Sequence, residues 1–300
     1  MLKTGSRLKM PRITVLDCVL SVLFLAGILY TVYRLQTVLT YKWDWKVIPQ
    51  YLVRYNGSTG RWVPNLLMQG LLTTLRLSIW TILLATSIGI AAGLCRTSHR
   101  LFRRLVGSCY VQIIRNIPPL VLIFIFYFFL GNQLIKALHL DEFVMTRSKE
   151  IQETLALLAA PPGTFSAFVS AVLTLGIYEG AYIAEIVRAG IQSIEKGQWE
   201  ASSSLGLSRW QQMRHVILPQ ALRRMLPPLA GQFISTIKDS SIVSVISIQE
   251  LTFQGLEIMA ATYRTFEIWI TITAMYFLVT VCCSIAASRL ERRLGGPANF

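Results

Sequence analysis

Charged and tyrosine side chains interrupt otherwise apolar stretches of the sequence, and their chemistry suits contact with a polar solute. Carboxylates inside apolar spans are costly, so they mark functional sites by default. Glu179 and Glu185 both lie in the apolar stretch 163–187. Tyr178 and Tyr182 share a helical face with Glu185, because residues four and seven positions apart lie on one side of a helix. That face is a candidate lining of a polar pathway, and Glu179 is a candidate on its charge alone.

Three further charged residues lie inside apolar stretches. Lys238 and Asp239 fall in the middle of the stretch 227–247. Adjacent residues point about 100° apart on a helix, so each would need a partner on another helix. The polar run Asp239-Ser240-Ser241 can equally mark the start of a broken or short span that packs internally. Arg76 lies about ten residues, or about 15 Å, inside the stretch 67–94, where it has either a structural or interfacial role or a role in ligand contact.

Other chemistries lack the residues they need. The three histidines are scattered without zinc spacing, and the five cysteines lie in or beside apolar runs, where a free thiol behaves as a small hydrophobe. No Gly-x-x-x-x-Gly-Lys-Ser/Thr segment is present to cradle a phosphate, and no Ser/His/Asp, His-Glu-x-x-His or paired-carboxylate arrangement accompanies the apolar stretches. We therefore predict no catalytic residue, no metal site and no cofactor bound by this chain.

The elements that must position these residues are membrane helices. Hydrophobic residues make up 53% of the 300 residues and charged residues 15%, whereas soluble domains contain roughly 25% charged residues. The formal net charge of +14 would suggest nucleic-acid binding in a soluble protein, but in a membrane chain it indicates basic cytoplasmic loops, and we predict no nucleic-acid partner. About 20 apolar residues cross the hydrocarbon core as a helix. Six candidate spans have about this length: 13–34, 67–94, 111–131, 163–187, 227–247 and 266–288.

Basic residues determine how these spans are oriented. An even number of spans puts both termini on the same side of the membrane. If that side is the cytoplasm, 18 of the 29 Lys and Arg residues lie on the cytoplasmic side and nine on the external side. Because basic loops stay in the cytoplasm, we predict that both termini are cytoplasmic. The first apolar stretch is too long for a cleaved signal peptide and no small-x-small site follows it, so it is predicted to be a retained helix. The external loops are then 35–65, 132–162 and 248–265.

The longest cytoplasmic loop, about 188–226, has the pattern of two short amphipathic helices. Gln198–Leu205 has helical character, Gly206 fits a helix stop, and Ser208 can cap a second helix that ends near Pro219. A rigid projecting helix of this kind can enter a groove on a partner protein. The alternative is a solvated amphipathic loop that lies on the lipid headgroups.

The same loop carries a motif that resembles a known family. The motif residues are Glu200, Ala201, Ser202, Gly206, Ile217, Leu218 and Pro219. They resemble the cytoplasmic signature loop of the permease subunits of bacterial ATP-binding-cassette importers. Segments that resemble the polar amino-acid subfamily, of the general L-amino-acid or glutamate/aspartate type, are Arg115-Asn116-Ile117-Pro118-Pro119-Leu120, Ala181-Tyr182-x-Ala184-Glu185-x-x-Arg188, Lys196-Gly197-Gln198 and Lys238-Asp239-Ser240-Ser241. The resemblance covers about residues 66–294.

The resemblance implies an all-α membrane protein with the type I importer permease fold and about six transmembrane helices. It divides the chain into an extra N-terminal helix with an external segment (1–65), a permease core (66–294) and a C-terminal tail (295–300). It implies import of a polar amino acid across the bacterial cytoplasmic (inner) membrane, with no enzymatic activity in this chain. The implied partners are two copies of an ATPase subunit that binds ATP and Mg, a second permease subunit, and an external solute-binding protein.

The resemblance also implies roles for individual residues. Small side chains such as Ala201 and Ser202 would permit close docking, although Ser202 stands where the family has alanine, and Glu200 would offer a carboxylate to a basic residue of the ATPase. With an amino acid as cargo, Arg76 or Lys238 is a candidate partner for its carboxylate. The alternative is an ion-coupled secondary amino-acid transporter, which would also use intramembrane carboxylates. That class typically has two internally similar halves, which this sequence does not show.

Overall fold

The computed structural model describes residues 14–38, 41–57, 60–135 and 137–293, and these are mostly helical, as predicted. The chain divides into two compact units, residues 1–44 and 45–300. The described part of the first unit contains helix α1 (Val15–Val38), whose apolar side chains, such as Leu20 and Phe24, are exposed. The predicted tail, 295–300, lies outside the described residues.

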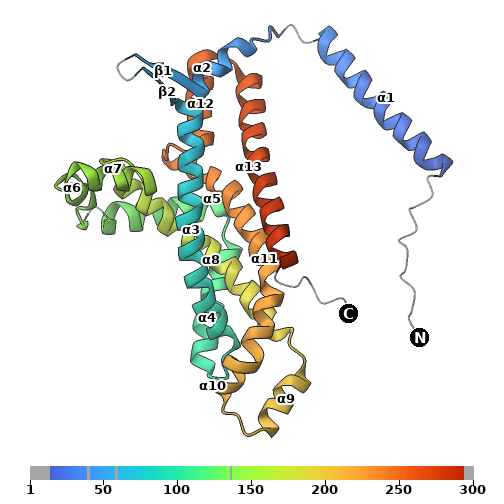
Figure 1. Cartoon of the computed structure of the whole chain (residues 1–300), viewed down its shortest axis with the longest axis vertical. Helices are drawn as coiled ribbons and strands as arrows, with labels where there is room; N and C mark the ends of the chain where they lie inside the picture. The colour runs from blue at the N-terminus through green and yellow to red at the C-terminus, as the bar shows by residue number, and fades with distance from the viewer. Residues whose placement is uncertain (1–13, 39–40, 58–59, 136, 294–300) are drawn as a thin grey trace. The chain divides into compact units, whose positions relative to one another are not determined.

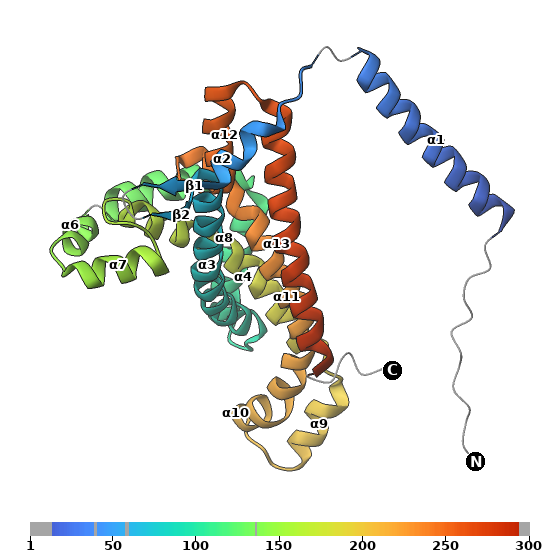
Figure 2. The same ribbon diagram turned by 45° about the horizontal axis from the view of Figure 1, so that its top comes forward.

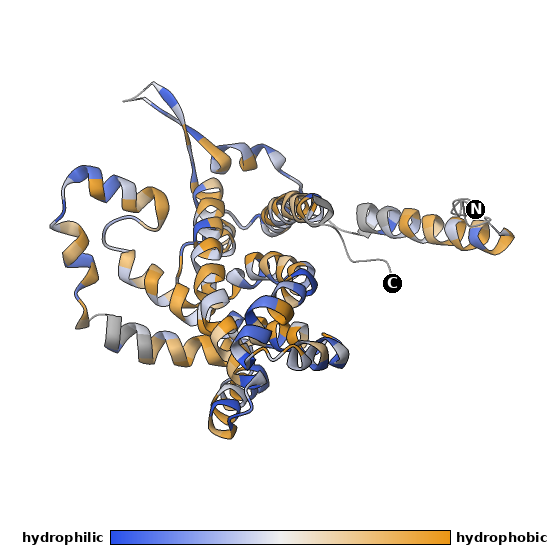
Figure 3. Cartoon of the chain, turned by 60° about the horizontal axis from the view of Figure 1, so that its bottom comes forward, coloured by the Kyte–Doolittle hydropathy of each residue, from blue (hydrophilic) through white to orange (hydrophobic). Residues whose placement is uncertain are grey.

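The second unit is built on long apolar helices (Figure 1), the longest of which are α3 (Leu66–Thr97), α8 (Phe165–Gln192) and α13 (Thr265–Arg293). Among the described residues these three are long and apolar enough to cross a membrane, and the number of spans rises to five if each of two bent helix pairs forms one span. Figure 3 shows apolar residues along the helices. Many are exposed, including Leu83 on α3 and Phe277 on α13, as a lipid-facing surface requires.

Helices α3 and α8 pack closely because glycines on each meet branched side chains on the other. A Cβ added at Gly89 of α3 would lie 2.5 Å from Cγ2 of Ile183, and one added at Gly180 of α8 would lie 3.0 Å from Cγ2 of Ile88. Small residues at such an interface let two backbones approach each other. The side of α8 that carries Gly180 therefore packs against α3 of the same chain.

The predicted span 111–131 is not one straight helix. The structure has α4 (Leu101–Asn116) and α5 (Pro119–Phe126), with a 113° bend between them. Ile117 is extended, with φ −96° and ψ 137°, because a following proline disfavours the α conformation. Beyond α5 the chain continues as a π-helical segment, η2 (Tyr127–Ile135). The double proline thus separates two helices, although Pro119 does begin the second of them.

The predicted span 227–247 is also interrupted. Helix α11 (Leu218–Asp239) begins earlier than predicted and changes at Ser240 into a 3-10 segment, η4 (Ser240–Ile246). Helix α12 (Leu251–Thr262) follows after a 49° bend. The polar run around Asp239 thus marks a change of helix type, which agrees with the predicted alternative of a broken span.

Several short elements lie where external loops were predicted, and the β-hairpin among them was not predicted. They are η1 (Trp45–Val47), α2 (Ile48–Leu52), strands β1 (Val53–Asn56) and β2 (Arg61–Pro64), α6 (Leu140–Met145) and α7 (Lys149–Leu158). The two strands pair antiparallel, with Arg54 opposite Val63. Helices α6 and α7 extend sideways from the long helices (Figure 2).

A buried carboxylate joins three helices near the start of α3. Glu250 is fully buried and caps α12 by accepting from the backbone N–H groups of Thr252 and Phe253 at 2.9 and 2.8 Å. The Tyr276 hydroxyl of α13 donates to Glu250 at 2.8 Å, and the Thr74 hydroxyl of α3 donates at 3.4 Å. Glu250 therefore fixes α12 against both long helices.

Candidate functional site

The predicted two-helix loop projects from the end of the second unit opposite the hairpin (Figure 1). Helix α9 (Lys196–Ser204) stops just before Gly206. Gly206 has a φ of 70°, the left-handed conformation that favours glycine. Helix α10 (Arg209–Gln211) begins with a reciprocal cap: Ser208 N–H donates to Gln211 Oε1 at 2.8 Å, and Gln211 N–H donates to Ser208 Oγ at 3.4 Å. The predicted stop and cap are confirmed, and both rigidify the turn.

The prediction that the second helix of the loop ends near Pro219 is wrong. Helix α10 continues through a π-helical segment, η3 (Gln212–Ile217), directly into α11. Pro219 is the second residue of α11 and directly follows the end of the π-helical segment. The loop is therefore shorter than predicted, since it is bounded by Gln192 of α8 and Leu218 of α11.

The predicted signature residues divide into an outward and an inward set. Glu200, Ala201, Gly206, Leu218 and Pro219 are exposed and can contact a partner. Ser202 and Ile217 are buried inside the loop. Ser202 donates to the Trp199 carbonyl at 2.9 Å, so its small side chain packs inside the loop, while Ala201 stays on the surface.

Two large apolar side chains on the loop add to its outward surface. Leu205 is 78% exposed and Trp210 is 69% exposed. An uninterrupted α-helix would place Trp210 on one face with Met213 and Ile217, but the π-helical segment that begins at Gln212 changes the phase. Single exposed apolar residues are ordinary, but two on a small projecting loop are typical of a protein contact.

The loop is held against the helices on its inner side. Ile217 packs with Ile191 and Ile194 at the end of α8. The guanidinium of Arg224 donates to the Ser193 carbonyl at 2.5 Å. These contacts link the last turn of α8 to the first turns of α11 across the base of the loop.

A groove of about 1100 Å³ separates the loop from the connection between α3 and α4. Its cations are Arg100 and Arg103 on one side and Arg209 on the other, while Glu200 lies among them. The groove is therefore basic overall, and an acidic surface would complement it.

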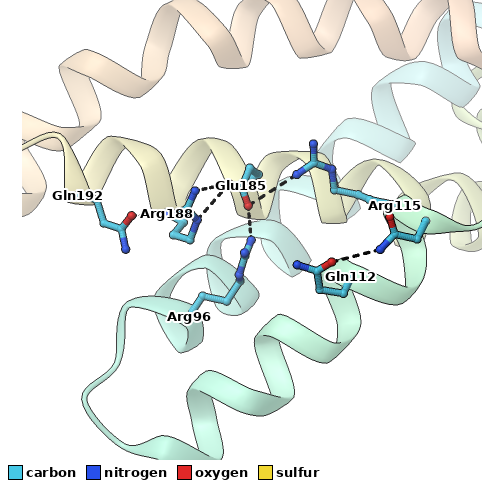
Figure 4. A network of polar contacts seen from close by, with 7 residues as sticks. Arg96, Gln112, Arg115, Glu185, Arg188 and Gln192 are labelled. Carbon is cyan, nitrogen blue, oxygen red and sulfur yellow. Dashed lines mark hydrogen bonds and ion pairs between the residues drawn. The ribbon is translucent and has the colours of Figure 1, made fainter.

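Glu185 forms ion pairs with three arginines from three helices (Figure 4). Arg96 of α3 and Arg188 of α8 bond its carboxylate directly, and Nη1 of Arg115 at the end of α4 lies 3.7 Å from Oε2. Arg188 also bonds Gln192, one turn further along α8. Helical spacing could reveal only the pair within α8, because Arg96 is 89 residues from Glu185 in the chain.

The predicted face of α8 is continuous with this cluster. The Arg115 guanidinium lies 5.3 Å from the centre of the Tyr182 ring, a cation–π contact. The Tyr178 hydroxyl donates to the Tyr182 hydroxyl at 3.2 Å. The structure thus brings Tyr178, Tyr182 and Glu185 together, with Arg115 between the tyrosines and the carboxylate.

Glu179 lies on a different side of α8 and is fully buried. Gln232 of α11 donates to Oε2 of Glu179 at 2.5 Å. Asp239, also on α11, interacts electrostatically with Glu179. Asp239 is half-buried whereas its neighbour Lys238 is exposed, so the two point apart as predicted. Arg76 is half-buried and lines a separate cavity on α3.

These features define a class: a helical membrane protein with polar clusters inside its helix bundle and a capped, rigid loop projecting from one end. The family described as "Binding-protein-dependent transport system inner membrane component" matches residues 85–296. The chain belongs to this family, and the inner membrane is its location.

Relatives and solved structures agree with this assignment. The chain is 39% identical over 229 residues to the glutamine transport system permease protein GlnP of Escherichia coli K12, covering 76% of this chain and 93% of that protein. It is 34% identical to the probable glutamine ABC transporter permease protein GlnM of Bacillus subtilis 168, covering 77% and 94%. The crystal structure of an amino acid ABC transporter with histidines superposes with a TM-score of 0.64 at 34% identity, covering 84% of this chain and 100% of that chain. The resemblance to amino-acid ABC permeases is confirmed.

Proposed function

We propose that this chain is the membrane-spanning subunit of an ATP-driven importer that moves a polar amino acid into the cell. The observation that carries the proposal is the projecting loop, with its glycine stop, its capped second helix and its exposed Glu200. A subunit without a phosphate-binding segment must receive work mechanically, and this loop supplies a stiff contact surface. Membership of a binding-protein-dependent transport family supports the direction of transport and the class of partner.

The proposed topology has six spans with both termini in the cytoplasm. The spans are α1, α3, the α4–α5 pair, α8, the α11–α12 pair and α13. The excess of basic residues on the side of the loop supports this orientation. In this topology the hairpin, α6 and α7 lie outside the cell.

The proposed assembly contains two copies of a separate ATPase subunit, a second permease subunit and an external solute-binding protein. ATP and Mg bind to the ATPase chains, and this chain contributes no catalytic residue. The exposed apolar residues Leu205 and Trp210 and the exposed carboxylate of Glu200 suit the contact with the ATPase.

We propose that the cargo is a polar amino acid, because the relatives named above transport glutamine or other amino acids. The proposed pathway residues are Arg76, Tyr178, Glu179, Tyr182, Glu185, Lys238 and Asp239. The polar clusters around Glu179 and Glu185 support this proposal, since charged groups inside a bundle favour a polar solute.

Reversal of the charge on the loop tests the coupling. Glu200→Lys places a cation on the exposed surface of α9, so we expect capture of the ATPase subunit to weaken by about tenfold, the loss of one charge-assisted contact. Co-purification of the ATPase with the tagged permease measures this effect. Glu153→Lys makes the same charge change on an exposed residue of α7 and should leave capture unchanged.

Normal ATPase capture and normal amino-acid uptake by the Glu200→Lys variant would contradict the proposed coupling. The ion-coupled alternative makes a separate prediction, because its uptake would continue in proteoliposomes that contain an ion gradient and no ATP. We expect uptake there only with ATP and the ATPase present.

A further inference from the structure

A cavity of about 420 Å³ lies between the first third of α3, the turn before α8 and the segment that joins η4 to α12. Its volume falls within the range of small-molecule sites, about 300–1,000 Å³. Its polar lining includes Gln69, Thr73, Arg76, Thr164, Gln249 and Gln254. The cavity therefore has room for a small organic solute and polar groups to orient it.

Arg76 is the one charged residue among the described residues that line the cavity. No carboxylate lines it to neutralise the guanidinium. A planar guanidinium in a partly buried site favours a carboxylate, which it can bind with two parallel hydrogen bonds. The cavity thus selects for an anionic group.

Gln254 adds an independent observation that points to a ligand. Its side chain is 4% exposed, and its Oε1 has no hydrogen-bond partner in the described part of the chain. A buried acceptor without a partner is unusual and costly, so it calls for a donor that the chain itself does not supply. An N–H group of a bound molecule would satisfy it.

The backbone holds these two groups in place. Gln69, Thr73 and Arg76 follow one another on a single face of α3. Gly70 lets α12 approach that helix, because a Cβ at Gly70 would lie 2.9 Å from Cα of Leu251 and 3.0 Å from Cγ of Gln254. The position of Gln254 is therefore fixed by packing, as a binding site requires.

We propose that this cavity binds a free α-amino acid, with its carboxylate on Arg76 and an N–H donor of the same molecule on Oε1 of Gln254. The inference rests on the proposed function and adds a site to it, because the cavity lies toward the hairpin end of α3. In the proposed topology that end is external, so the cavity receives the cargo before it reaches the clusters around Glu179 and Glu185.

Direct binding tests the site without transport. Isothermal titration calorimetry would use the permease–ATPase complex in lipid nanodiscs, without ATP or binding protein, and L-glutamine as the probe. We expect L-glutamine to bind wild type and to bind Arg76→Gln about tenfold more weakly or worse, the loss of a charged hydrogen bond. Arg76→Lys should restore part of the affinity, and Gln254→Leu should weaken binding.

L-glutamine amide, which lacks the carboxylate, should bind wild type and Arg76→Gln equally weakly. Lys149→Gln removes an exposed cation from α7 and is the control that should bind L-glutamine normally. Equal L-glutamine affinity in wild type and Arg76→Gln would overturn the inference, as would absence of binding to a complex that imports glutamine. A complex that binds L-glutamine with the expected Arg76 dependence but imports nothing with ATP would contradict only the proposed function.

Discussion

At the scale of single residues, Glu185 joins three helices through its ion pairs. Three guanidiniums from α3, α4 and α8 converge on its one carboxylate. The Arg96 side chain is 11% exposed, and its Nε atom has no partner among the described residues. Removing the carboxylate would leave three mutually repelling cations, and the largely buried Arg96 would lose the partner that offsets its desolvation.

Glu185→Gln should therefore lower the melting temperature of the solubilised permease. Losing hydrogen bonds to charged groups costs about 1–3 kcal/mol, which corresponds to a decrease of about 2 °C or more for a chain of this size. Thermal unfolding followed by circular dichroism measures the decrease. Added salt should recover part of it, because salt screens the repulsion between the arginines.

Glu257→Gln is the matched control, since Glu257 is an exposed carboxylate on α12. It should leave the melting temperature unchanged. If both variants have the same melting temperature as wild type, Glu185 does not hold the three helices together.

At the scale of elements, the turn between α9 and α10 determines how the loop is presented. Gly206 has a positive φ, and a Cβ there would meet no atom within 4 Å. The cost of a side chain at Gly206 is therefore backbone strain alone, about 1 kcal/mol. Gly197, in the first turn of α9, is equally open but has no positive φ.

The two glycines provide a paired test. Gly206→Ala should increase hydrogen exchange across α9 and α10 and weaken ATPase capture several-fold, because the strain loosens the turn. Gly197→Ala should leave exchange unchanged or slow it, since alanine favours helix over glycine. Equal exchange in the two variants would show that the left-handed turn does not define the loop.

Long apolar helices were predictable, whereas only one of their interruptions, the one near Asp239, was foreseen as an alternative. Helices α3 and α13 begin within one residue of their predicted spans, because about 20 apolar residues specify a span by themselves. The bend at Ile117 follows from Pro118, and the change to a 3-10 helix at Ser240 depends on backbone hydrogen bonding; hydropathy reports neither. The hairpin escaped prediction because each strand is only four residues long and largely exposed, so it carries little hydrophobic signal.

The candidate site was predictable where the signal was local. The stop at Gly206 and the cap at Ser208 follow from residue type and position. The inward position of Ser202 depends on how the loop folds back on α8, and the pairing of Glu185 with Arg96 depends on the packing of α3 against α8. Such contacts join distant parts of the chain, so a pattern within one helix cannot reveal them.

At the scale of the whole molecule, residues 1–44 form a unit of their own. The core clusters of the second unit are formed by residues from Ile48 onward. In the proposed topology a chain that begins at residue 45 would have five spans and an external N-terminus. The basic residues after α3 would still retain their loop in the cytoplasm.

Deletion of residues 1–44 should therefore leave a folded, correctly oriented core that captures the ATPase. A reporter fused to the C-terminus, active only in the cytoplasm, measures orientation, and thermal unfolding measures the core. A reversed reporter signal or a decrease of more than about 4 °C in melting temperature, roughly 1 kcal/mol or more, would contradict the independence of the two units.

The contacts at the base of the projecting loop have a mechanical consequence. Because Arg224 is bound to the Ser193 carbonyl and Ile217 packs on Ile191, a displacement of the loop moves the ends of α8 and α11 together. Helix α3 must follow α8, since their glycine-lined interface leaves no room to slide. A displacement of the loop is therefore transmitted to three helices at once.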